Sequence, residues 1–78
     1  MREKEKRLVV TFYTTAEAMA MEKLCRVRNL PGKCISAPRS VSADCGIAWS
    51  APWEAEAAIR QAVEETGLEI QGFHVLML

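Results

Sequence analysis

Two amphipathic segments, each flanked by short strand-like runs, constrain the fold of this chain more than any other feature. The chain has 78 residues, which is enough for one domain with a small core. Periodicity and turn residues predict six elements in order: strand 8–13, helix 16–29, strand 33–37, strand 45–49, helix 52–66 and strand 70–78. No linker or low-complexity segment separates them. The elements must therefore pack on one another.

Both helices carry sequence signals at their ends. Thr14 and Glu17 match a capping box ahead of the first helix, and Pro31 and Gly32 predict where it ends. Pro52 suits the first turn of the second helix, and Gly67 predicts its end. Apolar residues expected to face the core are Ala18, Ala20, Met21, Leu24, Cys25 and Val27 in the first helix, and Ala55, Ala58, Ile59, Ala62 and Val63 in the second.

The order β-α-β-β-α-β is typical of a ferredoxin-like α+β fold, in which two helices cover one face of a four-stranded antiparallel sheet. We expect residues 1–7 to form a charged flexible tail and residues 8–78 to form the single domain. The strand 33–37 is followed by Pro38 and is expected at an edge of the sheet.

Composition restricts the classes of partner. Half of the residues are hydrophobic and 26% are charged, as in soluble globular domains. Ten basic and ten acidic residues give a net charge of zero, which argues against general binding to nucleic acid or acidic membranes. The apolar runs are too short to cross a bilayer, and the chain opens on a charged run rather than a signal segment. Together with an odd number of cysteines, this predicts a reducing, cytoplasmic location.

Cys45 is the candidate reactive residue. The predicted topology brings it to the same end of the sheet as the start of the first helix, where amide donors and the helix dipole favour a thiolate. Arg39 would add positive charge, and Gly46 would let a partner approach closely. The competing interpretation is a small apolar residue beside a bend, and the neighbouring Asp44 disfavours ionisation.

The remaining cysteines and the one histidine carry weaker signals. Cys25 lies on the flank of the apolar stripe and is expected in the core. Cys34 could resolve a disulfide with Cys45, although simple hairpin register leaves the two out of alignment. His74 is expected to be a half-buried, hydrogen-bonded strand residue, and the cysteine spacings match no metal motif, so we expect neither a metal nor a cofactor. The sheet lacks the aromatic platform of an RNA reader, and we expect Trp49 and Trp53 to serve in packing first and a partner surface second.

The sequence resembles a small bacterial family of selenium/sulfur carrier protein-like domains, a domain of unknown function. The matching features are the run Thr11–Thr15 before a helix with Ala18, Glu22, Lys23 and Leu24, then Pro38-Arg39, Ser42 and Cys45-Gly46. The resemblance covers Leu8 to Val75 and implies that Cys45 holds a persulfide or selenopersulfide for transfer. In this sequence Asp44 stands where the family pattern has a small polar residue, and Cys25 and Cys34 match no cysteine of the pattern.

Two functions from different classes follow. In the first, Cys45 is the nucleophile of a stoichiometric carrier, supported by Arg39, Ser42, Gly46 and the amides near Thr14 and Thr15. Its partners would be a cysteine desulfurase-type donor and an acceptor protein. The alternative is a noncatalytic regulatory or assembly module that self-associates and binds a small molecule. An enzyme with its own turnover is the least favoured, because no acid or base accompanies Cys45. In either case the apolar last strand predicts a homo-oligomer.

Overall fold

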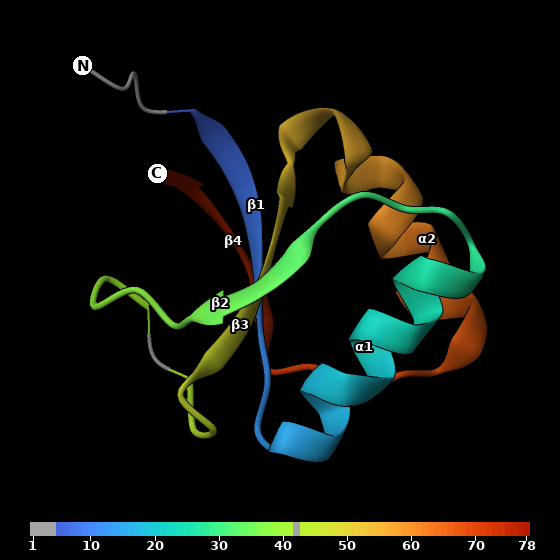
Figure 1. The fold of residues 1–78 in the computed structure, drawn as a ribbon, viewed down its shortest axis with the longest axis horizontal. Coiled ribbons are helices and arrows are strands. Elements are labelled where there is room, and N and C mark those ends of the chain that lie inside the picture. The colour runs from blue at the N-terminus through green and yellow to red at the C-terminus, as the bar shows by residue number, and fades with distance from the viewer. Residues whose placement is uncertain (1–4, 42) are drawn as a thin grey trace.

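A computed structural model describes residues 5–41 and 43–78 (Figure 1). Its elements are β1 (Lys6–Thr11), α1 (Thr15–Val27), β2 (Lys33–Ser36), β3 (Ile47–Pro52), the 3-10 helix η1 (Trp53–Ala55), α2 (Glu56–Thr66) and β4 (Gly72–Met77). The strands form one sheet in the order β2-β3-β1-β4, and every neighbouring pair is antiparallel. Both helices lie on the same side of the sheet (Figure 1). The predicted α+β ferredoxin-like fold is confirmed.

The strands are shifted along the chain relative to the prediction. β1 begins at Lys6, inside the segment predicted as a tail, and ends before Phe12. β3 begins at Ile47 rather than Cys45, because Gly46 has a φ of 75° and belongs to a turn. Pro52 ends β3 instead of opening the second helix, and η1 separates the two. The sequence pattern placed the elements correctly but not their ends.

The ends of α1 show one prediction confirmed and one wrong. Thr14 accepts a hydrogen bond from the Glu17 N–H while the Glu17 carboxylate accepts from the Thr14 N–H, which completes the predicted capping box. The helix ends at Val27, four residues before Pro31. Asn29 adopts a φ of 56°, and the Leu30 N–H donates to the Cys25 carbonyl, as in a Schellman motif. Backbone capping, rather than the proline, stops this helix.

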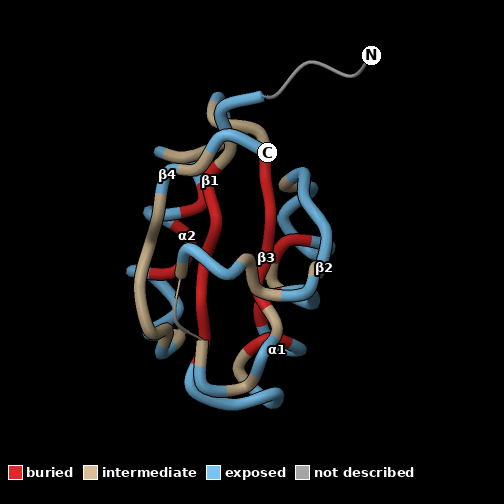
Figure 2. Tube along the Cα trace, turned by 90° about the vertical axis from the view of Figure 1, so that its left-hand side faces the viewer, coloured by how far each residue is buried: buried red, intermediate tan, exposed pale blue. Residues whose placement is uncertain are grey.

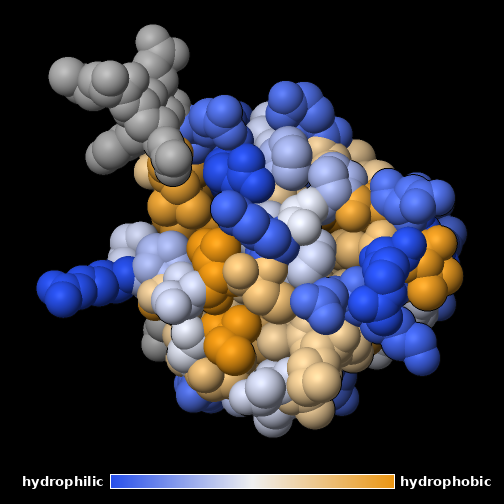
Figure 3. Space-filling model, in the orientation of Figure 1, coloured by the Kyte–Doolittle hydropathy of each residue, from blue (hydrophilic) through white to orange (hydrophobic). Residues whose placement is uncertain are grey.

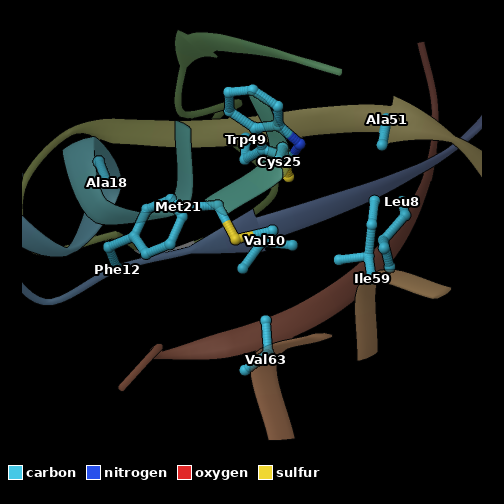
Figure 4. Packing of buried hydrophobic residues seen from close by; sticks show 10 residues of the cluster. All are labelled: Leu8, Val10, Phe12, Ala18, Met21, Cys25, Trp49, Ala51, Ile59 and Val63. Carbon is cyan, nitrogen blue, oxygen red and sulfur yellow. The ribbon is translucent and has the colours of Figure 1, made fainter. Parts of the chain in front are cut away.

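The core lies between the helices and the sheet. Alternate residues of β1 and β3 meet the buried face of each helix (Figure 4). The buried residues of the cluster are Leu8, Val10, Phe12, Ala18, Met21, Cys25, Trp49, Ala51, Ile59 and Val63. The buried stripe of α1 is therefore Ala18, Met21 and Cys25, whereas Ala20 and Val27, predicted to face the core, are exposed. The expected burial of Cys25 and Trp49 is confirmed.

Trp49 also fixes the connection before β2. A Cβ atom on Gly32 would lie 2.3 Å from Trp49 Nε1, and Gly32 has a φ of 138°. Only glycine accommodates both the indole contact and this backbone conformation. The Trp49 indole therefore packs directly against the backbone at Gly32.

The first part of the β2–β3 loop, residues 37–41, crosses the face of the sheet opposite the helices (Figures 1 and 2). Val9, Thr11, Ala48 and Ser50 point toward this face by strand alternation, yet each is at most 2% exposed. Arg7 Nε donates to Ser50 Oγ at 2.7 Å, so the Arg7 side chain also covers part of this face. The loop and these side chains thus bury much of a surface that two helices alone would leave open.

Candidate functional site

Three chain segments meet at one end of the sheet. Thr11 pairs with Ala48, and Ser36 pairs with Ile47, so the end of β1, the end of β2 and the start of β3 lie together. The start of α1 follows β1 directly at the same end. Cys45 is two residues before β3 and therefore lies there, as the topology predicted.

The backbone around Cys45 forms a tight turn. The Gly46 N–H donates to the Ala43 carbonyl and the Gly46 carbonyl accepts from the Ala37 N–H, both at 3.0 Å. The Cys45 side chain is half-buried, packs on the edge of the core cluster, and its thiol donates to the Ile47 carbonyl at 3.3 Å. Gly46 itself is exposed and has open space at its Cα. The thiol is thus held against the turn with solvent on one side.

Gln71 ties this turn to the rest of the domain. The Asp44 N–H donates to Gln71 Oε1 at 3.2 Å, and the Gln71 N–H donates to the Thr11 carbonyl at 2.7 Å. The residue before Cys45 is therefore anchored to the segment that precedes β4. Sequence reasoning missed Gln71, since a single glutamine before a strand carries no motif.

The other predicted site residues lie at the surface where the structure describes them. Arg39 is exposed in the β2–β3 loop, from which hydrophilic atoms project in Figure 3. Ser42 lies outside the described residues. Thr14 and Thr15 are exposed at the start of α1.

The helix amides that were expected to face a Cys45 anion already have a partner. The Glu17 carboxylate accepts hydrogen bonds from the N–H groups of Tyr13, at 2.8 Å, and of Thr14, at 3.4 Å. This places a negative charge at the helix start and uses donors that an anion would need. The amides of Tyr13 and Thr14 are therefore already used at the helix start, and support of a Cys45 anion by the amides near Thr14 and Thr15 stays a prediction.

The other two thiols differ from Cys45 in burial and in surroundings. Cys25 is 1% exposed, and burial, followed by the nearby Cys34, raises the pKa of its thiol to about 11. Cys34 lies on edge strand β2, where partial desolvation and then the Glu22 carboxylate raise the pKa of its thiol. The edge position expected for this strand is confirmed. Cys34 pairs with Trp49, four residues beyond Cys45, so the register separates the two thiols as predicted.

His74 lies on β4, next to Thr11 of β1. His74 is half-buried, and its Nε2 lies 3.2 Å from Thr11 Oγ1, so the predicted satisfied imidazole is confirmed. Among residues 5–41 and 43–78, no three His, Cys, Asp or Glu side chains gather as metal ligands would. No helix of these residues is long and apolar enough to span a membrane.

Comparison with known proteins gives one match. The model of a family described as "Putative Se/S carrier protein-like" matches residues 7–75. No curated protein matches the chain, and no solved structure does either. The family match spans nearly the whole domain, including the turn that holds Cys45. The chain therefore belongs to this selenium/sulfur carrier protein-like family.

Proposed function

We propose that the protein carries sulfur or selenium as a persulfide or selenopersulfide on Cys45. The observation that supports this most is the position of Cys45: a half-buried thiol in a tight turn at the end of the sheet, within the segment that matches the family. Exposed Gly46 beside it leaves room for the active site of a donor or acceptor protein. The carrier acts stoichiometrically and needs only one accessible thiol and a docking surface.

The transfer is an exchange between sulfur atoms. The Cys45 thiolate attacks the terminal sulfur of a persulfide on a cysteine desulfurase-type donor, forming a new S–S bond while the donor's S–S bond breaks. The donor cysteine leaves as a thiolate and takes up the proton that Cys45 released. An acceptor nucleophile later attacks the terminal sulfur in the same way and restores the Cys45 thiol. No external oxidant or reductant is consumed.

The surroundings of the three thiols favour Cys45 over the others. Raised pKa values keep Cys25 and Cys34 protonated near neutral pH, and burial shields Cys25 from any partner. Arg39 lies in the same loop as Cys45 and can contribute positive charge to an approaching persulfide. Thiol exchange requires a thiolate, so the raised pKa values count against Cys25 and Cys34 as the carrier thiol.

Intact mass spectrometry tests the proposal. Wild type, Cys45→Ser and the matched control Cys34→Ser are incubated with a cysteine desulfurase and cysteine, then measured with and without reductant. We expect wild type and Cys34→Ser to gain sulfur that reductant removes, and Cys45→Ser to gain none. Equal gain in all three proteins, or gain in none, would refute a selective carrier role for Cys45.

The second candidate is a noncatalytic module that binds a small molecule. An open apolar groove of about 370 Å³ favours it, a size within the range of ligand sites. Its lining residues are Ala20, Lys23, Leu24, Val27, Thr66 and Leu68. Figure 3 shows hydrophobic surface bordered by hydrophilic atoms near the end of α1. If this function holds, Cys45→Ser retains both ligand binding and self-association.

A further inference from the structure

The free edge of β4 carries backbone groups that nothing in the described chain pairs. Glu5 and Leu78 exchange both N–H···O bonds, at 2.8 and 2.9 Å, so this is a hydrogen-bonded pair of the antiparallel ladder. Such pairs alternate along the β1–β4 register, which assigns His74 and Leu76 to the bonds with β1. The N–H and C=O groups of Phe73, Val75 and Met77 therefore point away from the sheet.

This edge lacks the features that usually protect an edge strand. β4 pairs with β1 over all six residues without a bulge, and it contains no Lys, Arg, Asp, Glu or Pro. Val75 is 47% exposed and Met77 is 57% exposed. The opposite edge strand, β2, has four residues, begins at the exposed Lys33 and lies between two prolines. Of the two edges in the described sheet, the β4 edge is thus the open template for another strand.

We infer that β4 pairs antiparallel with β4 of a second copy of this chain, with the two-fold axis at Val75. The outward groups are symmetric about this residue, so Val75 pairs with its own copy and Phe73 pairs with Met77 of the other copy. Each outward donor then meets an acceptor, and the two sheets join into one of eight strands. A closed two-fold contact of this kind uses the same surface on both copies.

Charge and side-chain fit favour a second copy of this chain as the partner that pairs with β4. β4 brings no like charges together, and the net charge of each chain is zero. Phe73, Val75 and Met77 share one face, so the contact buries apolar side chains opposite one another. His74 and Leu76 face the other side and become cross-strand neighbours. This inference does not depend on the chemistry proposed for Cys45.

Sedimentation equilibrium tests the pairing with three variants. Val75→Pro removes an outward N–H without breaking a bond to β1, because proline is tolerated where an edge N–H faces solvent. Val75→Lys places two ammonium groups opposite each other at the two-fold axis. Val27→Lys is the matched control, since Val27 is 70% exposed on α1, far from the β4 edge.

We expect wild type and Val27→Lys to sediment at twice the 8.7 kDa chain mass, and both Val75 variants at the single mass with unchanged circular dichroism. The dissociation constant should rise at least tenfold for Val75→Lys. If Val75→Pro fails to fold, the dissociation constants of Val75→Lys and Val27→Lys are compared to test the pairing instead. A wild-type monomer at high concentration, or a Val75→Lys protein that associates as tightly as Val27→Lys, would overturn the inference.

Discussion

At the scale of single residues, burial of the Cys25 thiol makes stability depend on pH in alkaline solution. The pKa of this thiol rises from 9.0 to about 11 in the folded chain. Between these values the unfolded chain loses the proton and the folded chain keeps it. The stabilisation is complete below pH 9.0, and the free energy of unfolding falls by about 1.4 kcal/mol for each pH unit above it. We expect a loss of about 2–3 kcal/mol by pH 11.

Urea unfolding of wild type and Cys25→Ala between pH 8 and pH 11 measures this loss. Cys25→Ala is expected to be less stable at pH 8 but to lose less stability as the pH rises, because no buried thiol remains to resist ionisation. Cys45→Ser is the control, since it keeps both Cys25 and the neighbouring Cys34 that helps to raise its pKa. Parallel pH profiles for wild type and Cys25→Ala would contradict the assignment.

The residue identities alone pointed to some residues around the Cys45 turn and the start of α1, but they missed others. The Cys45-Gly46 pair and the Thr14 cap were visible because each carries a motif with a physical reason at its spacing. Gln71 was not, since its role depends on a hydrogen bond to Asp44, 27 residues away in the chain. Contacts between distant segments leave no local signal.

At the scale of elements, a hydrogen bond from the Asp44 N–H to Gln71 Oε1 joins the turn that holds Cys45 to the segment before β4. Gln71→Ala removes the acceptor of the Asp44 N–H. A neutral hydrogen bond contributes about 0.5–1.5 kcal/mol, which corresponds to about 2–10-fold in an opening equilibrium. Since Cys45 is half-buried in the closed turn, we expect iodoacetamide to modify it faster by about this factor in Gln71→Ala.

Peptide mapping after brief alkylation measures the rate at Cys45 separately from the rate at Cys34. Gln61→Ala removes a glutamine from α2 but keeps the hydrogen bond from the Asp44 N–H to Gln71, so it is the matched control, with an expected rate close to that of wild type. The prediction fails if Gln71→Ala reacts no faster than wild type, or if Gln61→Ala reacts as fast as Gln71→Ala.

The elements themselves were largely predictable, whereas the face that α1 buries was predicted only in part, since the expected stripe held the buried residues but also the exposed Ala20 and Val27. Apolar residues occupy more than half of the helix circumference, so several rotations satisfy the pattern equally. The observed choice of Ala18, Met21 and Cys25 depends on packing against Phe12 and Trp49, which lie in other elements. The start of α1 could be predicted because the cap at Thr14 is a local sequence motif. Its end at Val27 could not, because it depends on the backbone conformation of Asn29.

At the scale of the whole molecule, the β2–β3 loop contains the turn that holds Cys45. The loop covers the face that the helices leave free and carries both Arg39 and Cys45 (Figures 1 and 2). The sequence predicted a loop here but not its path, because nothing in its composition directs it across the face of the sheet (Figure 2). With this face covered, the β4 edge is the remaining apolar surface with unpaired backbone groups in the described sheet.

Two-fold pairing through β4 predicts a melting temperature that depends on protein concentration. When a dimer unfolds to two chains, a 100-fold rise in concentration stabilises it by about 2.7 kcal/mol. Unfolding two chains of 78 residues carries an entropy of about 0.33 kcal/mol/K, so the midpoint should rise by about 8 °C. Scanning calorimetry of wild type over this range measures the rise. Val75→Lys should melt at the same temperature throughout, because a monomer unfolds without a change in particle number. A constant midpoint for wild type would show that β4 stays unpaired in solution.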